Sequence, residues 1–165
     1  MELRSHIPAP RSPAVPAHGG RQLHWTGNAA KARVIDRILA DQRPSVTVFD
    51  YGAGRGGDWP LVLAQRPDLE LICYEPDPTA AADLARALAG QPARVLSGAQ
   101  FERADLGADY IVSFSVLEHV VDRAAYLGHA KRQLAADGTF FLNYDDGHFR
   151  TALDLDELRG WRASL

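Results

Sequence analysis

The chain has 165 residues, 46% of them hydrophobic, and its 18 basic and 21 acidic side chains give a formal net charge of −3. This length suits one domain with a single sizeable core, and the interspersed charges exclude the basic surface expected of a nucleic-acid-binding protein. The sequence has no apolar run of the roughly 18 residues needed to span a membrane, no apolar secretory segment in its first residues and no second cysteine to pair with Cys73, so we expect a cytoplasmic protein.

The N-terminal part of the chain divides into an expected arm and an expected helix. Residues 1–22 contain four prolines and a Gly-Gly pair but no apolar period, which predicts a flexible arm, with one domain over residues 23–165. Residues 28–41 carry apolar side chains at spacings of three and four, which predicts an amphipathic helix that Asn28 caps and Pro44 follows.

The next feature is a predicted strand that is followed by a glycine-rich turn. Residues 46–49 are apolar or β-branched and predict a buried strand, and four glycines follow within six positions, at Gly52, Gly54, Gly56 and Gly57. Glycine has no Cβ, so its backbone can take a positive φ and approach a ligand closely. A strand followed by such a turn is typical of a nucleotide-binding site.

The remaining sequence alternates helical patterns with short apolar strands. Strands that are apolar along their length and separated by helices indicate a mostly parallel sheet covered on both faces. The predicted fold is therefore a doubly wound α/β sandwich with five strands. We expect helices over 59–65, 79–88, 123–135 and 154–161, and strands over 69–74, 94–96, 109–114 and 139–144, with an Asp-Gly turn at 137–138 before the last strand.

Two classes of nucleotide compete for the glycine turn. Its glycines at 52, 54 and 57, with the acidic Glu75 about 20 residues on, satisfy the dinucleotide fingerprint and so allow a nicotinamide-dependent oxidoreductase. However, a buried carboxylate at the strand end, Asp50, suits a cationic ligand better than a pyrophosphate. Asp58 and Pro60 at the start of the next helix also weaken a phosphate site there. A dehydrogenase would further need a substrate domain, for which no residues remain.

The sequence resembles the class I S-adenosylmethionine-dependent methyltransferases over roughly residues 28–145. DYGAGRGG, residues 50–57, corresponds to the glycine-rich first motif of that family, and YEPD, residues 74–77, to the acidic end of its second strand. SFSVLEHV, residues 113–120, and LAADGTFFLNY, residues 134–144, resemble segments of the small-molecule branch that includes quinone-biosynthesis O-methyltransferases. The resemblance implies a Rossmann-like fold and S-adenosyl-L-methionine as cofactor.

The resemblance also implies which residues contact this cofactor. The backbone of residues 52–54 (Gly52, Ala53 and Gly54) would lie against the methionine and ribose, and Glu75 would accept hydrogen bonds from both ribose hydroxyls. Asp50 would orient the loop and favour the ammonium group, or alternatively hold only N–H groups of the turn. Around the adenine we expect Pro76, Gln100 and Phe101, where the Gln100 amide takes the place of the acid that many relatives carry. At the methionyl group we expect Phe114 and Ser115.

Methyl transfer asks little further chemistry of the protein. The sulfonium is already a good leaving group, so alignment dominates, and a base is useful only for a poorly ionised acceptor. We name His119 and His148 as candidate bases, with a structural or an ordinary loop role as the alternative for each. Asp145 and Asp146 either hold polar groups of the substrate or form a solvated turn. An acid is missing at the end of the fourth strand, where Phe114 stands, so we expect no metal.

The main departure from the resemblance lies after the fifth predicted strand. Relatives carry two further strands there as an antiparallel hairpin, whereas only about 20 residues remain here, so we expect that hairpin to be missing. The fifth strand would then be an apolar edge. A homo- or hetero-oligomeric partner, the helix over 154–161 or further chain could cover it.

The expected function is transfer of a methyl group from S-adenosyl-L-methionine to a small-molecule acceptor, at a hydroxyl oxygen. The alternative is a methyltransferase-fold binding or scaffold domain with little activity alone. We expect neither a nucleic-acid partner nor a membrane partner.

Overall fold

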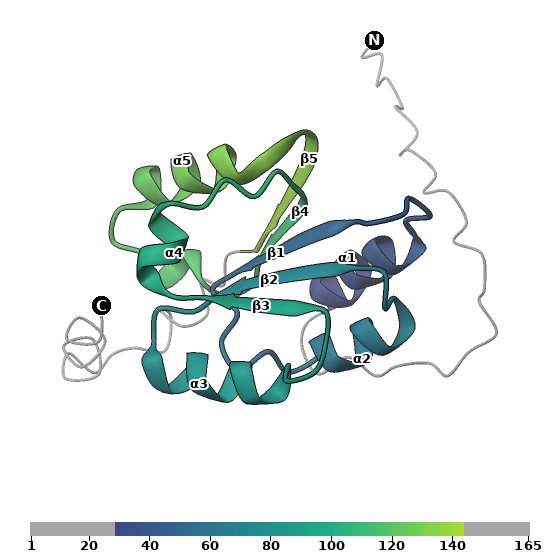
Figure 1. Cartoon of the computed structure of the whole chain (residues 1–165). Helices are drawn as coiled ribbons and strands as arrows, with labels where there is room; N and C mark the ends of the chain where they lie inside the picture. Colours follow the sequence, from purple (N-terminus) through teal and green to yellow (C-terminus); the bar gives the residue numbers. More distant parts are fainter. Residues whose placement is uncertain (1–28, 144–165) are drawn as a thin grey trace, which may run out of the picture.

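The structure is a computed structural model, and it describes residues 29–143 (Figure 1). The predicted arm over 1–22, the cap Asn28, the carboxylates of Asp145 and Asp146, His148 and the predicted helix over 154–161 lie outside the described residues. The strands are β1 Thr47–Tyr51, β2 Glu70–Tyr74, β3 Ala93–Leu96, β4 Ala108–Ser113 and β5 Leu134–Leu142. The helices are α1 Ala29–Ala40, α2 Trp59–Gln65, α3 Pro78–Ala87, α4 Gly98–Glu102 and α5 Arg123–Gln133, with the short 3-10 helix η1 Leu117–His119.

The five described strands form one parallel sheet in the order β3-β2-β1-β4-β5. The central strand β1 pairs on both sides, so that Phe49 lies opposite Ile72 of β2 and Ile111 of β4. Helices α1, α2 and α3 lie on one side of the sheet and α4 and α5 on the other (Figure 1). The predicted doubly wound α/β sandwich is confirmed.

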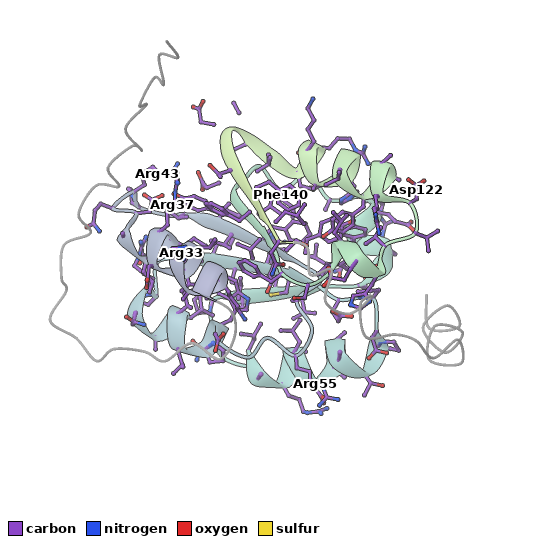
Figure 2. All side chains as sticks on the ribbon, turned by 180° about the vertical axis from the view of Figure 1, so that it is seen from behind. Arg33, Arg37, Arg43, Arg55, Asp122 and Phe140 are labelled. Atoms are coloured by element: carbon purple, nitrogen blue, oxygen red, sulfur yellow. The ribbon has the colours of Figure 1, made fainter. Side chains whose placement is uncertain are left out.

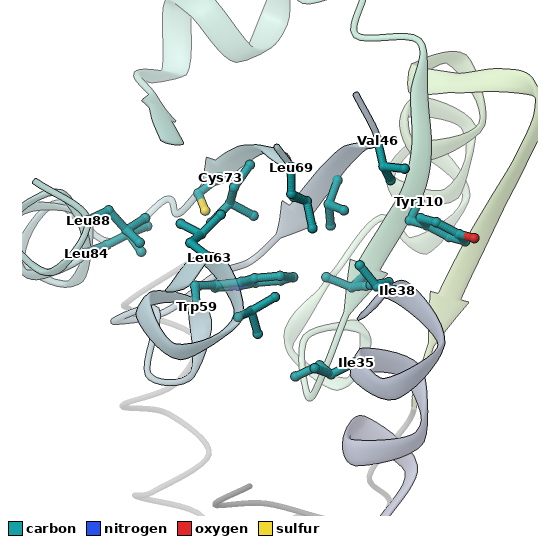
Figure 3. Packing of buried hydrophobic residues seen from close by; sticks show 14 residues of the cluster. Ile35, Ile38, Val46, Trp59, Leu63, Leu69, Cys73, Leu84, Leu88 and Tyr110 are labelled. Carbon is teal, nitrogen blue, oxygen red and sulfur yellow. The ribbon is translucent and has the colours of Figure 1, made fainter. Parts of the chain in front are cut away.

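The face of the sheet covered by α1, α2 and α3 holds an aliphatic core (Figure 3). Ile35 and Ile38 of α1 are fully buried there because the three-and-four spacing of the sequence gives that helix one apolar stripe. Trp59 and Leu63 of α2 pack into the same cluster, as does Cys73 of β2. The thiol of Cys73 is buried, and burial raises its pKa.

The opposite face is aromatic. Tyr51 of β1 stacks on Tyr126 of α5 with a ring-centroid distance of 4.1 Å. The Tyr126 hydroxyl shares a 2.6 Å hydrogen bond with Ser113 Oγ at the end of β4 and donates to the Tyr51 carbonyl oxygen at 3.2 Å. This hydroxyl therefore ties the ends of β1 and β4 to α5.

Replacing Tyr126 with phenylalanine is expected to lower the free energy of unfolding by about 1–2 kcal/mol, because buried polar groups of β1 and β4 lose a partner. Urea unfolding of the wild type and the variant measures this difference. Tyr110→Phe is the control, since the Tyr110 hydroxyl bonds a partly buried Asp41 at 2.7 Å and should matter less. An equal loss of unfolding free energy in the two variants would contradict the role of the Tyr126 hydroxyl in joining β1 and β4 to α5.

The start of β5 differs from the prediction. Gln133 ends α5 two residues early, β5 begins at once, and Asp137-Gly138 lies inside the strand instead of forming a turn before it. The register shifts here, because Ala108 pairs with Leu134 while Tyr110 pairs with Thr139. A Cβ on Gly138 would lie 2.6 Å from the Ala108 carbonyl oxygen, so glycine allows the two backbones to approach at this bulge.

Within the described residues β5 is an edge strand, paired with β4 alone. Its faces are nevertheless covered, since Phe140 packs against the aromatic core and Phe141 against the aliphatic one, while Leu142 is 38% exposed. On the α1 side, the Arg37 guanidinium lies 5.5 Å from the centre of the Phe141 ring. Arg33 and Arg37 line an open hollow of about 340 Å³ there (Figure 2). The expected apolar edge is therefore partly sheltered by the protein's own side chains.

Candidate cofactor-binding site

The carboxyl ends of β1, β2 and β4 meet beside the glycine loop that follows β1. The chain runs from β1 through β2 to β3 on one side of β1 and then continues with β4 on the other side. The carboxyl end of β1 is therefore the topological switch point of the sheet. Ligands of open α/β sheets bind at such points. The predicted site residues of the described region converge here from strands far apart in the sequence.

The glycine loop is anchored on both sides. The N–H groups of Gly52 and Ala53 donate to the Tyr74 carbonyl oxygen of β2 at 2.9 and 3.0 Å. Gly52 has a φ of +91°, and a Cβ there would lie 2.5 Å from Cγ2 of Val116, which follows β4. Glycine is therefore required at position 52 by both its backbone angle and the close approach of a neighbouring segment.

Glu75 closes the loop from the end of β2. Its Oε2 accepts a hydrogen bond from the Gly54 N–H at 2.8 Å, and its Oε1 accepts from the Asp77 N–H at 2.9 Å. Each carboxylate oxygen has a second lone pair, so the group can still accept from a ligand. Pro76 beside it is exposed, and Asp77 caps α3 by accepting from the Ala80 N–H.

Asp50 is held by a residue that sequence reasoning did not assign to the site. The indole Nε1–H of Trp59 donates to Asp50 Oδ2 at 2.5 Å, and both side chains are buried. Burial raises the pKa of Asp50 to about 6, although the Trp59 hydrogen bond and the Lys31 charge act in the opposite direction. The sequence signal was weak, because a tryptophan nine residues downstream of Asp50 is indistinguishable from an ordinary core residue.

Asp58 lies at the N-cap position of α2, yet its side chain makes no cap hydrogen bond. Its Oδ2 instead pairs with Nζ of Lys31 at 3.0 Å. The same ammonium lies 6.0 Å from the centre of the Phe114 ring, just after β4. This ion pair joins the start of α1 to the start of α2 on one side of the site.

The segment after β3 folds into the short helix α4, which the sequence analysis did not predict. The Gln100 amide oxygen accepts from the Ser97 N–H at 2.8 Å, and Ser97 Oγ in turn accepts from the Gln100 N–H, a capping box. The amide oxygen expected to meet the adenine therefore accepts one hydrogen bond within the cap and keeps a second lone pair for a ligand. Phe101 stacks on Tyr74 at 3.8 Å and packs against the His129 ring, which extends the aromatic core to this edge.

Ser115 marks a strained turn after β4. It has a φ of +57°, uncommon for a residue other than glycine, and its N–H donates to Asn143 Oδ1 at 2.6 Å. Strain of this kind often occurs at functional sites. His119 is the last residue of η1, about one turn beyond Ser115, and its side chain is half-buried.

The profile of a methyltransferase-domain family matches residues 23–164. The chain belongs to this methyltransferase family. No curated protein sequence matches it. The class I fold suggested by the sequence is thereby confirmed, and S-adenosyl-L-methionine is the cofactor that family and fold imply.

Solved methyltransferases share the fold at low sequence identity. An S-adenosyl-L-methionine-dependent methyltransferase from Methanococcus maripaludis is 16% identical, with a TM-score of 0.57 over 79% of this chain and 72% of its own. A TehB-like enzyme from Corynebacterium glutamicum is 21% identical, with a TM-score of 0.58 over 82% and 71%. A Haloferax volcanii protein, solved in complex with the Trm112 methyltransferase activator, is 15% identical with a TM-score of 0.55 over 82% and 66%. Several other matched structures are longer, and the chain spans 36% to 50% of them.

The groups at the site of this methyltransferase suit the implied cofactor. Val116 packs against Gly52, but an added Cβ at Gly54 would meet no atom within 4 Å, so the main chain is open at Gly54, as a ligand lying on the loop requires. Glu75 offers two carboxylate oxygens at the loop for a sugar diol. The buried carboxylate of Asp50 suits a ligand that carries positive charge. Among residues 29–143, no helix is long and apolar enough to span a membrane.

Glu118 was missed by the sequence analysis. It is 4% exposed, and neither carboxylate oxygen has a hydrogen-bond partner among residues 29–143. A signal was present in the sequence, because Glu118 is the acid within the otherwise mostly apolar run VLEHVV, residues 116–121.

Proposed function

We propose that the protein transfers the methyl group of S-adenosyl-L-methionine to a hydroxyl oxygen of a small-molecule acceptor. We place it in the branch that resembles the quinone-biosynthesis O-methyltransferases. The observation that carries this proposal is Glu75, whose carboxylate lies 2.8 Å from the Gly54 N–H and so faces the turn on which a nucleoside would rest. The segment SFSVLEHV supports the choice of branch.

The cofactor supplies an activated methyl group, and the protein's part is to hold it in line with the acceptor. Glu75 binds the ribose and the main chain at 52–54 supports the methionine end, while Asp50 provides a negative charge nearby. Phe114 and the strained turn at Ser115 border the reacting group. His119, half-buried one turn further on, is the described candidate for taking the acceptor's proton.

The second candidate function is that of a binding or scaffold domain that acts together with a partner subunit. Within the described residues β5 is an edge strand, and Leu142 on it is 38% exposed. The Haloferax volcanii methyltransferase was solved together with an activator protein. A scaffold role would be favoured if the chain bound the cofactor without turnover on any acceptor and co-purified with a second protein.

Replacing Glu75 with alanine is expected to weaken S-adenosyl-L-methionine binding by about 1–3 kcal/mol, or roughly five- to 150-fold in Kd, because a charged hydrogen-bond acceptor is lost. Isothermal titration of the wild type and the variant measures both constants. Glu70→Ala is the matched control, since Glu70 lies at the opposite end of β2 and pairs with the exposed Arg94. An unchanged affinity in Glu75→Ala would mean that the loop is wrongly assigned.

The acceptor is identified by the mass of its product. The wild type, incubated with S-adenosyl-L-methionine and fractionated metabolite extracts, should yield a product heavier by one methyl group. Fragmentation then locates the methyl on oxygen, nitrogen or carbon. A methyl found on nitrogen or carbon would refute the O-directed part of the proposal and leave the methyltransferase assignment intact.

A further inference from the structure

Glu118 is a buried carboxylate without a partner in the described part of the chain. It lies in η1 with 4% of its surface exposed, and both of its oxygens are enclosed without a hydrogen bond within residues 29–143. It also forms no ion pair within that range. An ionised carboxylate in such a place is strongly unfavourable unless a positive group or hydrogen-bond donors reach it.

The segment that carries Glu118 packs against the glycine loop. Val116, two residues earlier, lies so close to Gly52 that a Cβ there would be 2.5 Å from its side chain. The Tyr126 hydroxyl donates to the carbonyl oxygen of Tyr51, the residue before Gly52. Burial raises the pKa of Tyr126, and the charges of Asp50 and Glu118 add to this effect, so both carboxylates lie within electrostatic reach of that hydroxyl.

Three carboxylates lie around the glycine loop, and the charges of Lys31 and Arg132 act on Asp50 and Tyr51 there. Asp50, Glu75 and Glu118 follow or end three strands that meet at the switch point. The nearby ammonium of Lys31 is paired with Asp58 at 3.0 Å, on the α1 side of the sheet. A ligand that brings its own positive charge would further offset the three negative charges.

We propose that Glu118 is the counter-charge for the sulfonium of the cosubstrate and makes the protein prefer S-adenosyl-L-methionine to its demethylated product. This inference rests on the proposed function. The sulfur of the cosubstrate is positively charged and that of S-adenosyl-L-homocysteine is neutral, whereas the adenosine and amino acid ends are the same. An interaction with the sulfur charge alone therefore discriminates the two molecules and favours release of the product after transfer.

The test compares two ligands on one variant. Glu118→Gln keeps the shape of the side chain and removes its charge. In isothermal titration with the full chain, we expect its affinity for S-adenosyl-L-methionine to fall about tenfold or more and its affinity for S-adenosyl-L-homocysteine to change less than about threefold. Glu118→Asp, which keeps the charge, should retain the preference, and Glu102→Gln, on the exposed end of α4, should leave both affinities unchanged.

Stability without ligand gives a second readout. Removing an unpaired buried charge should leave Glu118→Gln at least as resistant to urea as the wild type. A less stable or unfolded variant would overturn the inference, because Glu118 would then have a partner elsewhere in the chain. An unchanged ratio of the two affinities would also overturn it, while leaving the proposed function intact. Failure of the wild type to bind either ligand would refute the proposed function and the inference with it.

Discussion

Replacing Asp50 with asparagine should stabilise the ligand-free protein at neutral pH and weaken its binding of S-adenosyl-L-methionine. Burial raises the pKa of Asp50 from 3.8 to about 6 in the folded state. Between these two values the folded protein holds a proton that the unfolded chain has released, so stability falls as the pH rises and stays low above pH 6. The shift corresponds to roughly 3 kcal/mol. The amide oxygen of asparagine can still accept the Trp59 hydrogen bond.

Urea unfolding of the wild type and Asp50→Asn from pH 4 to pH 8 measures this effect. The advantage of the variant should be small near pH 4, grow toward pH 6 and level off above it. Asp68→Asn is the control of opposite sign, because the hydrogen bond from Arg66 lowers the pKa of Asp68, a carboxylate that stabilises the fold when ionised. A difference between wild type and Asp50→Asn that did not vary with pH would contradict the raised pKa.

The cost of keeping Asp50 ionised has a function in the proposed site. If the proposed site is right, a charge that destabilises the empty fold becomes favourable when a cationic ligand binds. Glu118 is likewise a buried carboxylate, and its oxygens have no hydrogen-bond partner in the described residues. Both carboxylates should therefore trade stability of the empty protein for ligand affinity.

The pattern of apolar residues predicts well those strands and helices whose burial repeats regularly along the chain. β1 and β2 were predicted because their residues are apolar on both faces, and the parallel order followed from the intervening helices. The bulge at Gly138 was not predictable in the same way. It depends on the Ala108 carbonyl oxygen of another strand, and an Asp-Gly pair more often indicates a turn.

The site residues also fall into those that a local motif predicts and those that depend on tertiary contacts. Gly52 and Glu75 were predicted because a motif fixes their spacing, and in the structure Glu75 accepts a hydrogen bond from Gly54 of the same loop. The bond from Trp59 to Asp50 and the lack of a described partner for Glu118 depend on how helices dock against the sheet. Such contacts have no fixed spacing in sequence. Gln100 illustrates the converse, since its amide oxygen caps its own helix, a local role that its sequence position could have indicated.

Replacing Gly52 with alanine is expected to cost roughly 2–5 kcal/mol, a large share of the stability of a domain of this size. Two penalties combine at this position. The φ of +91° is rarely adopted by residues with a Cβ, and the added methyl would lie 2.5 and 2.9 Å from the two Cγ atoms of Val116. The loop cannot easily move away, because the Gly52 N–H is bonded to the Tyr74 carbonyl oxygen at 2.9 Å.

Two further variants separate these penalties in urea unfolding. Gly54→Ala has a φ of +56° and no atom within 4 Å of the added methyl, so it should show a backbone cost alone of about 1–2 kcal/mol. Gly52→Ala combined with Val116→Ala removes the overlap and should recover part of the loss beyond the cost of Val116→Ala by itself. Equal losses in Gly52→Ala and Gly54→Ala would show that Val116 does not press on the loop. The close contact between the glycine turn and the segment leading to Glu118 would then be wrong, and the argument for a shared cofactor site would lose its geometric basis.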